Sequence, residues 1–75
     1  MTGEIFDVHE GHLVSLAASV AAGCLPCAGY YIDRAREAGV GNERLRGAIA
    51  IAEAVRRQAL DDLARRVRSR IGETA

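Results

Sequence analysis

Two cysteines are the residues best suited to chemistry in this chain, and they stand three positions apart in the segment Cys24-Leu25-Pro26-Cys27. Proline is tolerated in the first turn of a helix, because its missing N–H would have no helical partner there. We therefore expect the pair at a helix start, where free N–H groups and partial positive charge stabilise a thiolate. One thiol would become a sulfenic acid or a mixed disulfide, and the other would close on it. The spacing predicts a redox-active dithiol; the alternative is two small buried residues.

Two histidines offer a second interpretation of the same cysteines. His9 and His12 are three positions apart, which is about one helical turn. With Cys24 and Cys27 they make a Cys₂His₂ set, the ligand count of a closed structural zinc site. A bound metal would also stabilise a small core. Zinc binding is therefore an alternative hypothesis, whereas the redox-active dithiol requires no cofactor.

The composition limits the class of protein. The chain has 75 residues, of which 49% are hydrophobic, so we expect a single domain spanning residues 1–75. A chain of this length buries only about 60% of its unfolded surface, so a disulfide, a metal or a neighbouring subunit should stabilise it. Residues 13–32 carry no charge, but serines, glycines, a proline and many alanines make a membrane span the weaker interpretation. No positively charged flank of an export signal precedes them, and we expect a cytoplasmic protein without a membrane partner.

The charges are balanced overall but unevenly placed. Ten arginines lie in residues 34–75 against six acidic residues, which gives this half a net charge of +4. A basic half can indicate a nucleic-acid partner. Acidic residues stand four positions before arginines at Glu53–Arg57, Asp61–Arg65 and Asp62–Arg66. This is the favourable order for ion pairs within a helix, so we expect a self-paired helix face and no nucleic acid.

The elements that must position these residues are helical. Apolar residues at helical spacing predict a helix over about residues 8–22, which Gly23 interrupts. A second helix is expected from the cysteine pair to Ala38, before the glycine-rich segment 39–41. A third begins at a cap formed by Gly41 or Asn42 and keeps an apolar stripe to the C-terminus.

The third helix is too long for a small globule. About 28 residues at 1.5 Å each make a rod of roughly 40 Å. A 75-residue globule has a radius of gyration of only about 11 Å. We therefore expect the far end of the rod to overhang its own domain and to pack its apolar residues against another subunit.

Three segments together resemble the carboxymuconolactone decarboxylase family, and more closely its alkylhydroperoxidase D-like branch. They are residues 13–27 (LVSLAASVAAGCLPC), 35–40 (AREAGV) and 45–50 (LRGAIA). The resemblance covers roughly residues 8–60. It implies an all-α domain that assembles into homo-oligomers and reduces small hydroperoxides, its cysteine pair cycling through a disulfide. A thiol reductant protein or a lipoyl-type reductant would then regenerate the pair.

The chain departs from this branch at two positions. The branch has a histidine four residues after the second cysteine, where this chain has Tyr31, and a glutamate twelve before the first, where it has His12. In the family these two residues relay the proton that activates the thiol. Histidine can act as a base near neutral pH, whereas tyrosine is a poor base that can donate a hydrogen bond.

The resemblance thus makes Cys24, Cys27, His12 and Tyr31 the candidate catalytic residues. By the family pattern Cys27 attacks the peroxide and Cys24 resolves, whereas helix-terminus electrostatics alone favours Cys24 as the more acidic thiol. Beside the redox enzyme and the zinc module, a non-catalytic oligomeric scaffold of the same fold is the third hypothesis.

Overall fold

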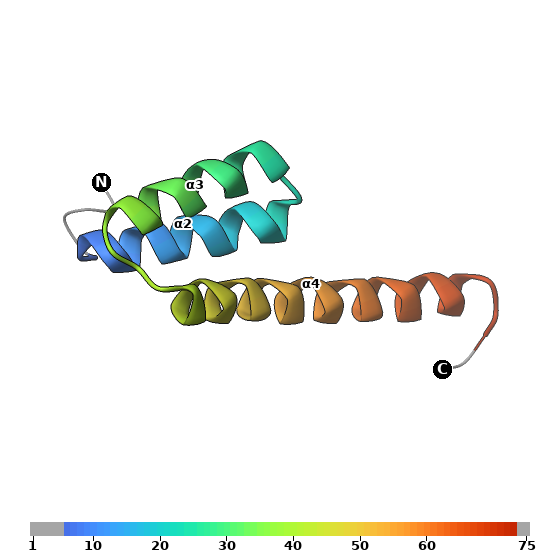
Figure 1. Cartoon of the computed structure of the whole chain (residues 1–75). Coiled ribbons are helices and arrows are strands. Elements are labelled where there is room, and N and C mark those ends of the chain that lie inside the picture. The colour runs from blue at the N-terminus through green and yellow to red at the C-terminus, as the bar shows by residue number, and fades with distance from the viewer. Residues whose placement is uncertain (1–5, 74–75) are drawn as a thin grey trace.

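The structure, a computed structural model, describes residues 6–73, and over this range it is all-α with no strand. Its three helices are α2 (Val8–Ala22), α3 (Leu25–Glu37) and α4 (Asn42–Arg70). Helices α2 and α3 form an antiparallel hairpin, and α4 lies along α2 and runs in the same direction (Figure 1). The predicted helical class and the predicted order of helices are confirmed.

Helix α2 is fixed by strong signals at both ends. Asp7 and Glu10 form a capping box, in which the Asp7 carboxylate accepts the Glu10 N–H at 2.7 Å and the Glu10 carboxylate accepts the Asp7 N–H at 3.2 Å. At the other end Gly23 has a φ of 74°, a left-handed conformation that favours glycine. The N–H groups of Gly23 and Cys24 close the helix on the carbonyls of Val20 and Ser19, both at 3.0 Å. The predicted bounds of this helix are confirmed.

Helices α3 and α4 begin and end where local signals place them. Pro26 lies in the first turn of α3. Gly39, with a φ of 90°, follows its C-terminal end, and the Val40 N–H donates to the Ala35 carbonyl at 2.9 Å. Gly41 is the N-cap of α4, which then continues for 29 residues without a break.

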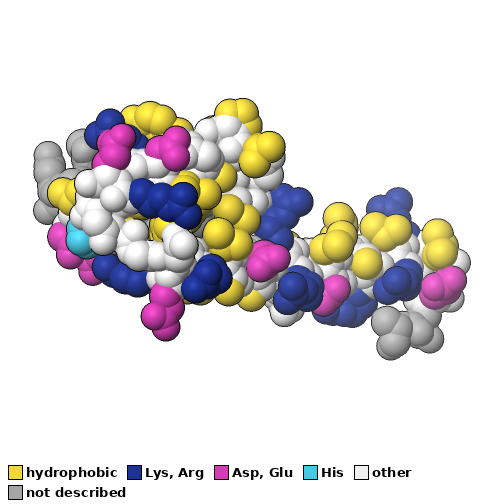
Figure 2. Space-filling model, viewed as in Figure 1, with side chains coloured by type: hydrophobic (Ala, Val, Ile, Leu, Met, Phe, Trp, Pro, Cys, Tyr) yellow, Lys and Arg dark blue, Asp and Glu magenta, His cyan; other side chains and the backbone are white. Residues whose placement is uncertain are grey.

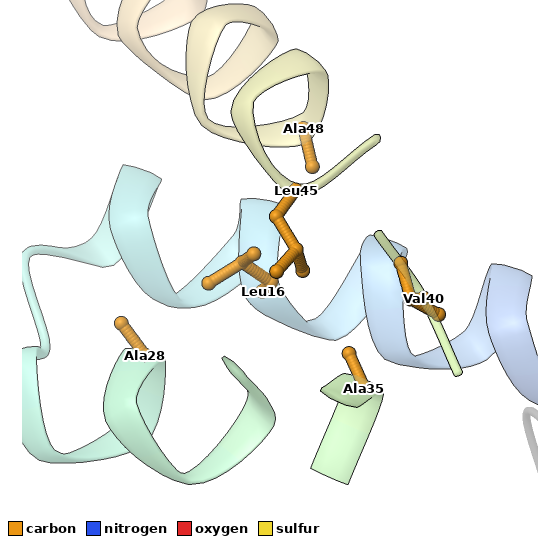
Figure 3. Packing of buried hydrophobic residues seen from close by; sticks show 6 residues of the cluster. All are labelled: Leu16, Ala28, Ala35, Val40, Leu45 and Ala48. Carbon is orange, nitrogen blue, oxygen red and sulfur yellow. The ribbon is translucent and has the colours of Figure 1, made fainter. Parts of the chain in front are cut away.

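The core is small and consists mostly of alanine. Leu16 of α2 is fully buried between Leu45 of α4 and two alanines of α3 (Figure 3). It is the one large side chain that is fully buried among the described residues. The buried apolar residues are Leu16, Ala28, Ala35, Val40, Leu45, Ala48 and Ala52. Alanine lets helices approach closely but adds little burial per residue, so this core provides limited stability.

Two side-chain hydrogen bonds join residues of different helices across the fold. The His9 ring donates from Nε2 to the Ala38 carbonyl at 2.6 Å, which joins the start of α2 to the end of α3. Arg56 Nη1 donates to the Ala21 carbonyl at 2.8 Å, which joins α4 to the last turn of α2. The second bond satisfies one of the carbonyls that every helix leaves free at its C-terminal end.

Arg56 contacts the last turn of α2, and the C-terminal part of α4 runs past the hairpin as an isolated helix (Figure 1). We call residues 57–70 the free half of α4. The molecule measures 51 × 24 × 20 Å, and its radius of gyration is 15.9 Å, against about 11 Å for a globule of this length. The predicted overhang is confirmed. None of the helices in the described range is both long enough and apolar enough to cross a membrane.

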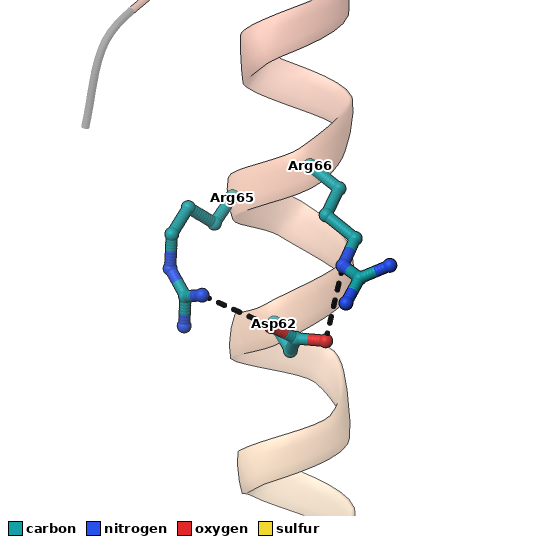
Figure 4. Close-up of polar contacts among 3 residues, drawn as sticks. All are labelled: Asp62, Arg65 and Arg66. Carbon is teal, nitrogen blue, oxygen red and sulfur yellow. Dashed lines mark hydrogen bonds and ion pairs between the residues drawn. The ribbon is translucent and has the colours of Figure 1, made fainter.

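The ion pairs of the free half differ in part from those predicted. Asp62 pairs with Arg66 at 3.3 Å, as the spacing predicts, and also with Arg65 at 2.9 Å (Figure 4). The predicted pair of Asp61 with Arg65 is wrong, because Arg65 turns to the aspartate three positions before it. Glu53 forms no ion pair within residues 6–73. Exposed pairs of this kind contribute little stability, about 0–1 kcal/mol each.

Candidate redox site

Cys24 and Cys27 lie at the tip of the α2–α3 hairpin and are joined by a disulfide. Their Cα atoms are 5.3 Å apart, within the usual range for a disulfide. The predicted position at a helix start is confirmed, since Cys24 is the N-cap of α3 and Cys27 lies in its first turn.

Cys24 belongs to two helix ends at once. Its N–H closes the last turn of α2 on the Ser19 carbonyl, and its Sγ accepts the N–H of Cys27 at 3.3 Å. Both bonds fix the loop, so the sulfur sits at the positive end of the α3 dipole. In the reduced protein the same N–H can stabilise a thiolate at this position. Cys24 is half-buried, whereas Cys27 is exposed.

The disulfide borders an open hollow of about 360 Å³ between α2 and α3. The residues that line it are Ser15, Ala18, Ser19, Ala22, Cys24, Cys27 and Tyr31. None of these side chains is charged at neutral pH in the oxidised state, and most are small. The hollow can therefore receive a small, weakly polar molecule next to the sulfur atoms.

Tyr31 is the aromatic residue of the hollow. It lies one helical turn after Cys27 and also packs partly against the core, so the same residue borders the hollow and contributes to the packing of the hairpin. Its ring meets that of Tyr30 edge to face, with 5.1 Å between the centroids. The Arg34 guanidinium lies over the exposed Tyr30 ring, 5.8 Å from its centroid. This stacking restricts the orientation of the ring that borders the hollow.

His12 does not line the hollow. It lies on α2 one turn before Ser15, which lines the hollow, and ten residues before Ala22, at the end that leads to the cysteines; ten residues correspond to about 15 Å along the helix axis. The structure therefore places Tyr31 in the same hollow as the cysteine pair, whereas His12 lies outside the lining of that hollow. A role for His12 as the base stays a prediction.

Ser15 and Ser19 are polar residues of the hollow that sequence reasoning missed. The Ser19 hydroxyl is buried and donates to the Ser15 carbonyl at 2.8 Å. The signal that could have found them is their spacing from Ala22, since positions 15, 19 and 22 share one face of the helix that leads to Cys24.

The four-ligand zinc site is not formed. His9 and His12 lie near the start of α2, whereas the cysteines follow its end, and the His9 ring is bonded to the Ala38 carbonyl. Within residues 6–73, no three or more His, Cys, Asp and Glu side chains are grouped so that they could hold a metal ion.

The comparisons with known proteins agree with this architecture. The model of the carboxymuconolactone decarboxylase family matches residues 3–68, which is most of the chain. No curated protein and no solved structure matches the chain. The family is all-α, and the joined cysteines fit the redox role of its CxxC branch. The chain belongs to the carboxymuconolactone decarboxylase family.

Proposed function

We propose that this chain is a thiol-dependent hydroperoxide reductase that works through Cys24 and Cys27. The observation that carries the proposal is the disulfide-linked pair at the N-terminus of α3, beside an open and uncharged hollow. The pair is close enough to cycle between a dithiol and a disulfide without rearrangement of the two helices.

The reaction starts from the dithiol, and the exposed Cys27 attacks. Its thiolate sulfur bonds to the outer oxygen of the hydroperoxide, the O–O bond breaks, and the alkoxide takes up a proton and leaves as the alcohol. Cys27 is now a sulfenic acid. The Cys24 thiolate attacks its sulfur, the S–S bond forms, and hydroxide takes up a proton and leaves as water. Two electrons pass from the two thiols to the peroxide.

An external dithiol closes the cycle. Its thiolate attacks the disulfide, and a second exchange releases both cysteines as thiols while the reductant becomes a disulfide. The exposed position of Cys27 at the hairpin tip leaves it accessible to such a reductant.

The surroundings of the pair support these steps. The α3 N-terminus stabilises thiolates. In this proposal the thiols therefore lose their protons through the electrostatic effect of the helix, without a neighbouring side chain that acts as a base. The Tyr31 hydroxyl donates a hydrogen bond to the peroxide or to the thiolate. Because the two Cα atoms are held 5.3 Å apart, the second step is intramolecular and needs no diffusional encounter.

The test is the loss of tert-butyl hydroperoxide in the presence of dithiothreitol, combined with the intact mass of the protein. We expect the reduced parent to consume the peroxide while dithiothreitol is present, and to lose two hydrogens as the disulfide forms when peroxide is added after the dithiothreitol has been removed. The double variant Cys24→Ser, Cys27→Ser should do neither, while circular dichroism confirms that it keeps its helices. Equal peroxide consumption by the double variant and the parent would overturn the proposal.

Dithiol–disulfide exchange with a protein is a second candidate function. The observation that favours it is the exposure of the tip, where Leu25, the first residue of α3, is 82% exposed and Cys27 is accessible. If the reduced chain reacted faster with a protein disulfide than with a hydroperoxide, the result would favour this function. If the parent showed neither activity, the non-catalytic scaffold would be selected instead.

A further inference from the structure

The cysteine pair lies between two helix ends of opposite polarity. Cys24 is the N-cap of α3, and its N–H closes the last turn of α2 on the Ser19 carbonyl. A helix carries about half a positive charge at its N-terminus and about half a negative charge at its C-terminus. The end of α3 therefore stabilises a thiolate at Cys24, whereas the end of α2 opposes it. A positive charge at the end of α2 would remove this opposition.

The two helices of the hairpin bring no such charge to the cysteines. The last turn of α2 has no basic residue, the first turn of α3 has no acidic one, and residues 13–32 carry no charge at all. On α3 the first charged residues are Asp33 and Arg34, six and seven positions after Cys27. In the hollow, Tyr31 is the titratable side chain besides the cysteines, and neither histidine of α2 lines it.

Helix α4 supplies the positive charge through Arg56. The Arg56 Nη1 donates to the Ala21 carbonyl at 2.8 Å, and the carbonyls of Ser19 and Val20 in the same turn are bonded to backbone N–H groups. Ala21 is the third residue before Cys24, and three residues span at most about 11 Å. Figure 2 shows basic side chains where α4 passes the end of the hairpin. The guanidinium thus occupies the place where a helix favours a cation.

We propose that Arg56 is a positioning residue of the redox site, which stabilises the Cys24 thiolate by neutralising the negative end of α2. Its consequence for turnover rests on the proposed function. In that cycle the Cys24 thiolate attacks the sulfenic acid of Cys27, and it leaves again as a thiolate when the reductant attacks Cys27. A more stable thiolate is present in a larger fraction and is a better leaving group.

The first experiment measures the alkylation of Cys24 by iodoacetamide as a function of pH, in a chain where Cys27→Ser leaves one thiol. The thiolate is the reacting species. Arg56→Gln should move the profile to higher pH and lower the rate on its rising part about threefold, which corresponds to one charge at a helix end. Above about pH 10 the two rates should converge, because the thiol is then ionised in both chains.

Two further variants separate the charge at the helix end from other effects. Arg56→Lys keeps the charge and should react nearly as fast as the parent. The matched control is Arg57→Gln, which removes the same charge from the neighbouring exposed position of α4 and should leave the profile unchanged. At about 1 M salt the difference between Arg56→Gln and the parent should shrink, because the screening length falls to about 3 Å. Circular dichroism of each variant confirms that the helices are kept.

Three results would each overturn the proposal. They are equal alkylation profiles for Arg56→Gln and the parent, a rate difference that persists above about pH 10, and an equal shift caused by Arg57→Gln. The alkylation experiment uses no peroxide, so a chain that fails to reduce peroxide still gives a result for Arg56. Conversely, a parent that reduces peroxide but shows no effect of Arg56→Gln on alkylation would overturn this inference alone.

Discussion

The two sulfur atoms of the hairpin tip differ in exposure, and this difference sets the order of attack that we expect. Cys27 is exposed and Cys24 is half-buried as the N-cap of α3. With reduced protein and no reductant, Cys27→Ser should consume no more hydroperoxide than the double variant. Cys24→Ser should consume one equivalent and stop at the sulfenic acid, because no second thiol is left to close the disulfide. Intact mass after dimedone trapping checks this, and the opposite pattern would make Cys24 the attacking residue.

Tyr31 and His12 occupy the two positions where the chain departs from the peroxidase branch. Only Tyr31 lines the hollow beside the cysteines, so we expect substitutions of the two residues to change the rate of peroxide consumption differently. Tyr31→Phe should lower the rate of peroxide consumption about tenfold, because the free energy of one hydrogen bond to a charged group corresponds to a factor of about this size. His12→Ala should change it less than about twofold, because a base must lie within about 3 Å of the proton that it takes. The control is Tyr30→Phe, which removes the neighbouring hydroxyl outside the hollow. A larger loss from His12→Ala than from Tyr31→Phe would show that His12 does reach the thiols.

At the scale of the helices, the left-handed end of α2 supports the loop that presents Cys24. Gly23→Ala should destabilise the protein by about 1–2 kcal/mol, because a Cβ is unfavourable at a φ of 74°. Gly29→Ala is the matched control within α3, where the added methyl meets no atom within 4 Å. It should stabilise the helix by about 0.4–1 kcal/mol through the reduced entropy of the unfolded chain. Urea denaturation measures both, and shifts of the same sign would contradict this account of the loop.

The sequence allowed the helix bounds and the cysteine pair to be predicted, because their signals are local. Gly23, Pro26 and Gly39 end or begin helices through their own backbone preferences. The side-chain bonds that join different helices could not be predicted in this way. His9 and Ala38 are 29 positions apart, and Arg56 and Ala21 are 35 apart. The lining of the hollow was missed for the same physical reason, since it depends on how α3 folds back along α2.

At the scale of the whole molecule, the core is small and rich in alanine and a helix projects from it, so we expect the stability of the fold to depend on association. If the free halves of α4 pair, the melting temperature should rise with protein concentration, because binding of a second copy stabilises only the folded chain. In Leu63→Asp, which places a carboxylate on the exposed apolar face of the free half, this dependence should disappear. Calorimetry of both proteins at two concentrations is the measurement, and a parent melting temperature that does not change with concentration would contradict pairing. The overhang of α4 could be predicted from the length of the helix alone. What covers the exposed apolar face of the overhang could not be predicted, because helix length does not identify a binding partner.

The position of Tyr31 beside the disulfide gives the protein an optical property. The chain has two tyrosines and no tryptophan, so its ultraviolet emission comes from Tyr30 and Tyr31. A disulfide quenches the fluorescence of an aromatic ring that lies close to it, and a pair of thiols quenches it less. Reduction of the Cys24–Cys27 bond should therefore brighten the tyrosine emission, and oxidation should dim it. The native chain thus reports the redox state of its own cysteines without an added dye.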